Sequence, residues 1–195
     1  MCKLKSAIVL KDRIFMPDYD SHSRMLEELK ITDDYLGASK KFVRVELSPA
    51  NGDVFSNVDE WELNVDQDIK PEWFSEDEYK PKIVEAVKEW AKTHIHLGVD
   101  RLRIDAGTNH YIKNCKDVEI YGSATVKNIC GSATVKNIYG SATVVSSPYT
   151  KWGNANSLII ANNATFKDNY GKVIYQSGDF KLISVESGKA IGEIQ

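Results

Sequence analysis

The sequence YGSATVKNI-CGSATVKNI-YGSATV, residues 121–144, repeats one nine-residue unit almost three times. Glycine recurs at positions 122, 131 and 140, and the residue before each glycine is the one that varies: Tyr121, Cys130 and Tyr139. Identical units at a short, fixed period are typical of stacked repeat proteins, in which each unit contacts its neighbours. The architecture of the second half of the chain is therefore expected to follow from this stretch.

Within one unit, small aliphatic residues alternate with hydroxyl residues. Ala124 and Val126 should face one side of a strand, and Ser123 and Thr125 the other. We expect a β-solenoid with the aliphatic side chains inside and one or two nonamers per side or turn. A β-meander is the alternative. Calcium-binding nonapeptide repeats fit less well, because the unit lacks their acidic position.

The composition is that of a globular protein: 42% of the 195 residues are hydrophobic and 27% are charged. The chain has no apolar run of membrane-spanning length, and the short run Ala7–Leu10 ends at three charged residues. We therefore predict neither a membrane span nor a signal peptide. The chain has three cysteines, Cys2, Cys115 and Cys130, an odd number without the spacing of a metal site. This predicts a cytoplasmic, reduced protein.

Charge is distributed unevenly along the chain. Residues 1–97 contain 14 Lys and Arg against 20 Asp and Glu, whereas residues 98–195 contain 11 against 8. No cluster of basic residues with interleaved aromatics supports a nucleic-acid partner. We predict two domains: an acidic α+β domain at residues 1–98 and an all-β solenoid at 99–195, whose degenerate terminal coils cap the array.

The first domain combines alternating strand patterns with helical stripes. We expect strands within 6–15, 42–47 and 60–65 in an antiparallel sheet, a short helix after the capping residue Ser21, and a long helix over 75–95. In the strand at 42–47, Arg44 and Glu46 are expected to face outward.

Beyond the repeats, short strands are expected to continue at a spacing of about ten residues. Residues 146–156 should interrupt the array. Polar pairs such as Asn162-Asn163 and Ser177-Gly178 should then separate the later strands.

Cys2 and His22 are the candidate catalytic residues. Removal of the initiator Met would place the Cys2 thiol beside its own α-amino group, which has a typical pKa of about 7.7–8 and can act as a base. His22 could act as its partner, oriented by Glu46 or Asp66. The alternative is a terminal thiol and a histidine that only begins a helix.

The other histidines do not predict a metal site. His94 and His96 are placed two residues apart on the long helix, where their rings would point to different faces. His110 is expected to be isolated. We therefore predict no bound metal and no cofactor.

The outward side chains of the repeats form the candidate binding surface. A flat, regular face suits an extended protein partner, although a simply solvated face is the alternative. An open terminal coil could also pair edge to edge into a homodimer. The candidate binding residues are Ser123, Thr125, Lys127, Ser132, Thr134, Lys136, Ser141 and Thr143.

Three stretches carry a resemblance to other proteins: CKLKSAIVLKD at 2–12, PDYDSH at 17–22 and EWELNVDQDIKPEWF at 60–74. With the helix AVKEWAKTHI and the GSATV nonamers, the chain over about residues 1–145 resembles a group of uncharacterised bacterial and phage proteins. The resemblance implies a bacterial or phage setting, in which inhibition of a host defence system is the expected activity.

The first two residues, Met1-Cys2, are also similar to the start of SRAP-domain proteins, which use that cysteine to crosslink abasic DNA. Those proteins continue with Gly-Arg, whereas this chain has Lys3-Leu4.

Two hypotheses about function follow from the sequence. The first is a non-enzymatic binding or inhibitor protein that uses the solenoid surface, and the alternative is a thiol enzyme or covalent binder that uses Cys2. Binding explains more of the sequence.

Overall fold

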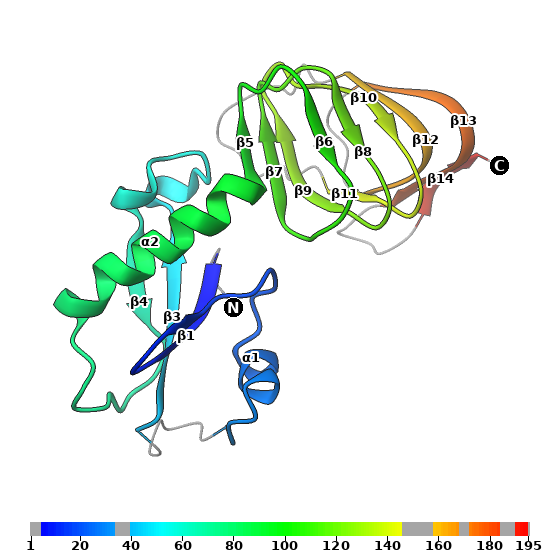
Figure 1. The fold of residues 1–195 in the computed structure, drawn as a ribbon. Helices are drawn as coiled ribbons and strands as arrows, with labels where there is room; N and C mark the ends of the chain where they lie inside the picture. Colours follow the sequence, from blue (N-terminus) through cyan, green and yellow to red (C-terminus); the bar gives the residue numbers. More distant parts are fainter. Residues whose placement is uncertain (1–4, 34–39, 146–157, 168–171, 184–189, 195) are drawn as a thin grey trace. The chain divides into compact units, whose positions relative to one another are not determined.

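The computed structural model describes residues 5–33, 40–145, 158–167, 172–183 and 190–194 (Figure 1). Its contacts divide the chain into two compact units, Met1–Lys92 and Thr93–Gln195. The division lies close to residue 98, where the sequence pattern changes from helical to β.

The first unit contains an antiparallel sheet in the order β2-β1-β3-β4. The strand pair expected within residues 6–15 consists of β1 and β2. The register places Ala7 of β1 opposite Val45 of β3, and Val45 lies opposite Val65 of β4. The strands are β1 (Lys5–Leu10), β2 (Ile14–Phe15), β3 (Phe42–Ser48) and β4 (Glu62–Val65). The predicted antiparallel sheet is confirmed.

Helix α1 (His22–Glu28) packs against one face of this sheet. Ser21 is its N-cap, and the Ser21 hydroxyl accepts a hydrogen bond from the Arg24 backbone N–H at 3.4 Å. Its buried Met25 and Leu26 join Ile8 and Phe42 in one hydrophobic cluster. The helix therefore satisfies an end N–H group and buries its apolar side at the same time.

Helix α2 (Glu76–His94) supplies a second apolar surface to the first unit. Its buried residues recur at helical spacing: Tyr79, Ile83, Val84, Val87, Trp90 and His94. The Lys5 ammonium lies 5.0 Å from the centre of the Trp90 ring. Because Lys5 and Ile8 point to opposite faces of β1, the two helices cover opposite faces of the sheet.

Arg44 and Glu46 of β3 were expected to face solvent, and this prediction was wrong. Their exposed fractions are 7% and 5%. Successive side chains of β3 do point to opposite faces of the sheet. However, α1 and the loops around it cover the face on which Arg44 and Glu46 lie, so these polar side chains occupy a buried layer.

The second unit is built from parallel strands in two rows. Row A contains β5 (Ile95–Leu97), β7 (His110–Lys113), β9 (Thr125–Cys130) and β11 (Thr143–Val145). Row B contains β6 (Leu102–Ile104), β8 (Val118–Ile120) and β10 (Thr134–Ile138). The chain changes row after each of these strands (Figure 1). Side chains of both rows belong to one buried hydrophobic core.

The nonamers are distributed alternately between the two rows. Val144 pairs with Val126 in row A, whereas Val135 pairs with Val118 in row B, and all four are fully buried. Alternate nonamers, eighteen residues apart, therefore stack directly on one another. We propose that this alternation is the β-solenoid expected from the repeats, with two nonamers in each circuit.

The repeats turn between rows at glycines with left-handed backbone angles. Gly140 has a φ of 78°, and a Cβ atom there would meet the backbone oxygen of Gly122 at 2.8 Å. The Ser141 N–H donates to that same oxygen at 2.9 Å. Glycine is needed at this corner because both the backbone angle and the close stacking exclude a side chain.

The last described strands extend both rows. The start of β12 (Leu158–Lys167) pairs with β10 and its end with β11, and β13 (Lys172–Ile183) runs parallel to β12. β14 (Ala190–Ile194) pairs antiparallel with β13. The breaks expected at Asn162 and Ser177 lie inside β12 and β13, where the ladder shifts register. The interruption expected at 146–156 lies outside the described residues.

Row alternation makes a testable prediction about deletions. Removing residues 122–139 deletes two nonamers and leaves every later strand in its row, whereas removing 131–139 deletes one and transfers every later strand to the other row. We expect the shorter deletion to lower the midpoint of thermal unfolding further, by about 5 °C or more relative to the longer one. Circular dichroism melting of both proteins measures this. Equal melting temperatures would contradict the alternation.

Candidate functional site

The polar side chains expected to bind a partner are divided between the two rows. Thr125 and Thr143 are direct partners in row A, whereas Thr134 lies in row B. Lys127 lies in β9 of row A and Lys136 in β10 of row B. The three serines lie in the corners before the strands: Ser123 and Ser141 before strands of row A, and Ser132 before β10 of row B. Lys136 is ion-paired with Asp117 at 2.7 Å. The eight residues thus form two separate surfaces.

Row B also carries aromatic residues on its outer side. Tyr121 follows β8 and Tyr139 follows β10, and their rings stack with centroids 5.1 Å apart and planes at 17°. The Arg103 guanidinium lies 4.4 Å from the Tyr121 ring centre. Tyr139 is 39% exposed. We refer to the following group as the tyrosine patch: Arg103, Glu119, Tyr121, Asn137 and Tyr139.

Hydrogen bonds hold the tyrosine patch in place. The Tyr121 hydroxyl donates to Glu119 at 3.2 Å, the Asn137 amide donates to the same carboxylate at 3.3 Å, and the Tyr139 hydroxyl donates to Asn137 at 3.4 Å. Desolvation, and then the hydrogen bond to Glu119, raise the pKa of Tyr121. These hydrogen bonds link the two tyrosines through Glu119 and Asn137.

The sequence contained the signal for this patch, but our sequence reasoning missed it. The variable position of the nonamer reads Tyr121, Cys130, Tyr139. Since the rows alternate, both tyrosines fall at the end of row B strands, whereas Cys130 ends β9 of row A and is buried. A residue type that recurs every eighteen residues, at one position of a nine-residue repeat, occurs in every second repeat. It therefore lies on one row only and indicates a surface that the other row lacks.

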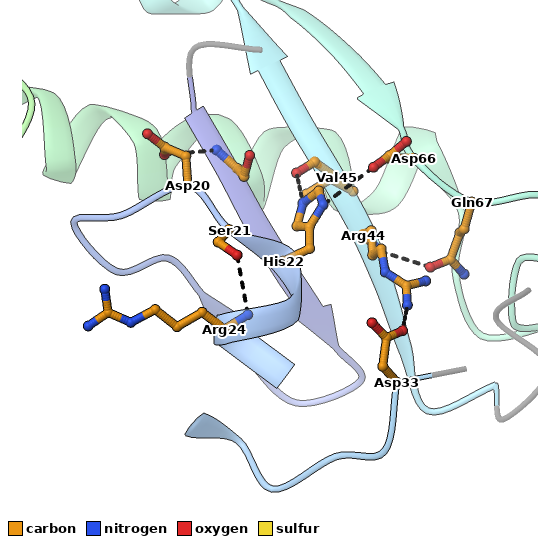
Figure 2. Close-up of polar contacts among 10 residues, drawn as sticks. Asp20, Ser21, His22, Arg24, Asp33, Arg44, Val45, Asp66 and Gln67 are labelled. Atoms are coloured by element: carbon orange, nitrogen blue, oxygen red, sulfur yellow. Dashed lines mark hydrogen bonds and ion pairs between the residues drawn. The ribbon is translucent and has the colours of Figure 1, made fainter. Parts of the chain in front are cut away.

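A pocket of about 710 Å³ lies in the first unit, at the start of α1 (Figure 2). Its lining residues include four aspartates but a single arginine, Arg44. The aspartates are Asp20, Asp33, Asp66 and Asp68, and His22, Ser21 and Gln67 line the pocket as well. His22 is thus placed in a polar, acidic pocket. Cys2 lies outside the described residues, so the Cys2–His22 pair stays a prediction.

His22 is held between a backbone carbonyl and a carboxylate (Figure 2). Its Nε2 lies 3.1 Å from the Val45 oxygen, and its Nδ1 lies 3.4 Å from Asp66 Oδ2. Glu46 is close as well, because the ligand atoms of His22, Glu46 and Asp66 all lie within 4.8 Å of one another. Both residues expected to orient His22 therefore lie beside it.

The remaining histidines form a stacked cluster in the second unit, so the expectation of an isolated His110 was wrong. Its ring centre lies 5.0 Å from that of His94 and 5.6 Å from that of His96, with nearly parallel planes. His96 was expected on the helix, but α2 ends at His94 and His96 lies in β5, which pairs with β7. Strand pairing therefore brings the three rings together.

Comparison with known protein families, with curated protein sequences and with solved structures finds no match to this chain. Among the described residues, no helix has both the length and the apolarity needed to cross a membrane.

The histidine cluster makes stability depend on pH. Burial, and then the nearby His110 and His94, lower the pKa of His96 from 6.5 to about 4. Between these values the unfolded chain binds a proton that the folded chain does not, so stability falls as the pH drops through this window. We expect the free energy of unfolding to fall between pH 7 and 4 by about 1–2 kcal/mol less in His96→Gln than in the wild type. This figure allows for solvent screening of a half-buried ring.

Denaturant unfolding of both proteins at several pH values measures this difference. Glutamine keeps an N–H donor near His110 Nδ1, which lies 3.4 Å from His96 Nε2, without a group that titrates. Parallel pH profiles for the two proteins would show that His96 has an ordinary pKa in the folded state.

Proposed function

We propose that this chain is a non-enzymatic binding protein of the inhibitor type, which uses its repeat unit to occupy a surface of a protein partner. The observation that carries the proposal is the partly exposed Tyr121–Tyr139 stack on row B. Tyrosine and arginine are enriched among the residues that dominate binding energy at protein interfaces. Side chains already held by hydrogen bonds lose little conformational freedom on binding.

The charges around the patch favour a protein partner over nucleic acid. Arg103 is paired with Asp105 at 2.9 Å, and Lys136 is paired with Asp117. Binding to a phosphate backbone relies on several basic side chains that can each neutralise a phosphate. A surface whose cations already have carboxylate partners is better suited to the mixed polar and aromatic surface of a protein.

The resemblance to phage and bacterial proteins suggests which partners to test first. A component of a bacterial defence system in the cytoplasm would be blocked simply by having its surface covered. The buried Cys115 thiol, which donates to the His96 carbonyl at 3.3 Å, suits such a reducing compartment. A homodimer through a strand edge stays a prediction.

The proposal is tested with a double variant on each row. We expect Tyr121→Ala with Tyr139→Ala to weaken the partner's binding by about 30-fold or more, as loss of an interface hot spot does. The matched control is Thr125→Ala with Thr143→Ala, two directly paired outward residues of row A. The partner is first captured from a bacterial lysate with the wild-type chain and identified, and affinities are then measured with the purified pair.

The pattern across the two variants decides the outcome. Loss of binding in the row A variant alone would move the interface to row A. Unchanged affinity in both variants would remove the repeat unit from the binding surface. Melting temperatures close to the wild type are required of each variant, so that a lost interaction is not a folding defect.

A further inference from the structure

The layer between α1 and the sheet contains polar groups where a core would be apolar. His22, Arg44 and Glu46 are each more than nine-tenths buried, and Ser6, directly opposite Glu46 in the β1–β3 ladder, is fully buried. Within the described part of the chain, the Ser6 hydroxyl and Arg44 Nη1 find no hydrogen-bond partner. Buried polar groups are costly unless they are paired or bind an ion.

The orientation of His22 defines which ring nitrogen is available to a ligand. A carbonyl oxygen can only accept, so His22 Nε2–H donates to Val45 at 3.1 Å. In the neutral ring, Nδ1 then presents its lone pair to the Asp66 carboxylate, and two acceptors face each other. Histidines that bind metals are commonly oriented in this way, with the second ring nitrogen donating to a backbone carbonyl.

The separation between these two acceptors fits a shared metal ion. Zinc ligands lie about 2.0–2.1 Å from the ion, which places neighbouring ligands of a tetrahedron about 3.3–3.4 Å apart. His22 Nδ1 and Asp66 Oδ2 are 3.4 Å apart. A charge-assisted hydrogen bond would be shorter, about 2.7–2.9 Å.

We propose that His22, Glu46 and Asp66 bind a divalent transition-metal ion of the zinc type. Imidazole nitrogen and carboxylate oxygen are both zinc ligands. The ligand atoms of the three side chains lie within 4.8 Å of one another. The site belongs to the first unit and does not depend on the tyrosine patch.

The surroundings indicate an open site. The side chain of Asp66 is 54% exposed and lines the pocket of about 710 Å³, so a fourth coordination position would face the pocket. Three protein ligands with one open position are typical of zinc sites that bind water or an exogenous ligand. The excess of aspartates in the pocket also attracts a cation.

Isothermal titration of the full chain with zinc chloride, after removal of metals by a chelator, tests the proposal. We expect one zinc ion to bind at this site, and Asp66→Asn to weaken its affinity at least tenfold. Asp66 is exposed enough for the variant to fold, and a thermal melt checks this. The matched control is Asp68→Asn, an exposed carboxylate of the same pocket. A second control, His96→Gln, reports on zinc bound at the histidine cluster.

Imidazole nitrogen NMR gives a readout that a merely structural role would not change. Zinc should shift the Nδ1 resonance of His22 while Nε2 keeps its proton. A proton on Nδ1 instead of a metal would leave this resonance unchanged on addition of zinc, and that result would overturn the proposal. Equal zinc affinity in Asp66→Asn and wild type would overturn it too, as would loss of binding in His96→Gln alone.

Discussion

The described rows of the second unit depend on one packing constraint: an inward side chain lies beside its counterpart on the paired strand of the same row. Parallel strands are about 4.8 Å apart, so a side chain in the core contacts its counterparts directly. Val126 and Val144 satisfy this in row A, and Val118 and Val135 in row B. A larger residue at one place would clash with two neighbours, and a smaller one would leave a gap beside each. Repetition of the aliphatic residues is the sequence consequence.

The same constraint explains why departures from the repeat are informative. Core packing requires similarity every eighteen residues, but it does not require a tyrosine at the partly exposed positions 121 and 139. Tyr121 and Tyr139 keep the eighteen-residue period while Cys130 breaks the nine-residue one. Burial is consistent with a small residue at Cys130 in row A, but packing of the core gives no reason for the two tyrosines of row B. A difference in what each row contacts does give one.

Much of the architecture followed from local pattern, whereas the sites depended on contacts between distant segments. Alternation predicted the inward aliphatic residues and the antiparallel sheet, and apolar residues at helical spacing predicted the long helix. Alternation could not predict that Arg44 and Glu46 are buried, because alternation along β3 says nothing about what covers the second face of the strand. The pattern also could not place His96: α2 ends at His94, two residues earlier, so His96 lies in β5, which pairs with the strand that carries His110.

The buried charges of the first unit are difficult to explain by stability alone. Apolar residues of similar size at buried ion pairs are often neutral or stabilising, because they avoid the cost of removing charge from water. Arg44 has a carboxylate partner in Asp33, yet one of its nitrogens finds no acceptor among the described residues. His22 and Asp66 face each other at a distance too long for a strong hydrogen bond. Such a centre is better explained by the ligand it would hold than by the fold it supports.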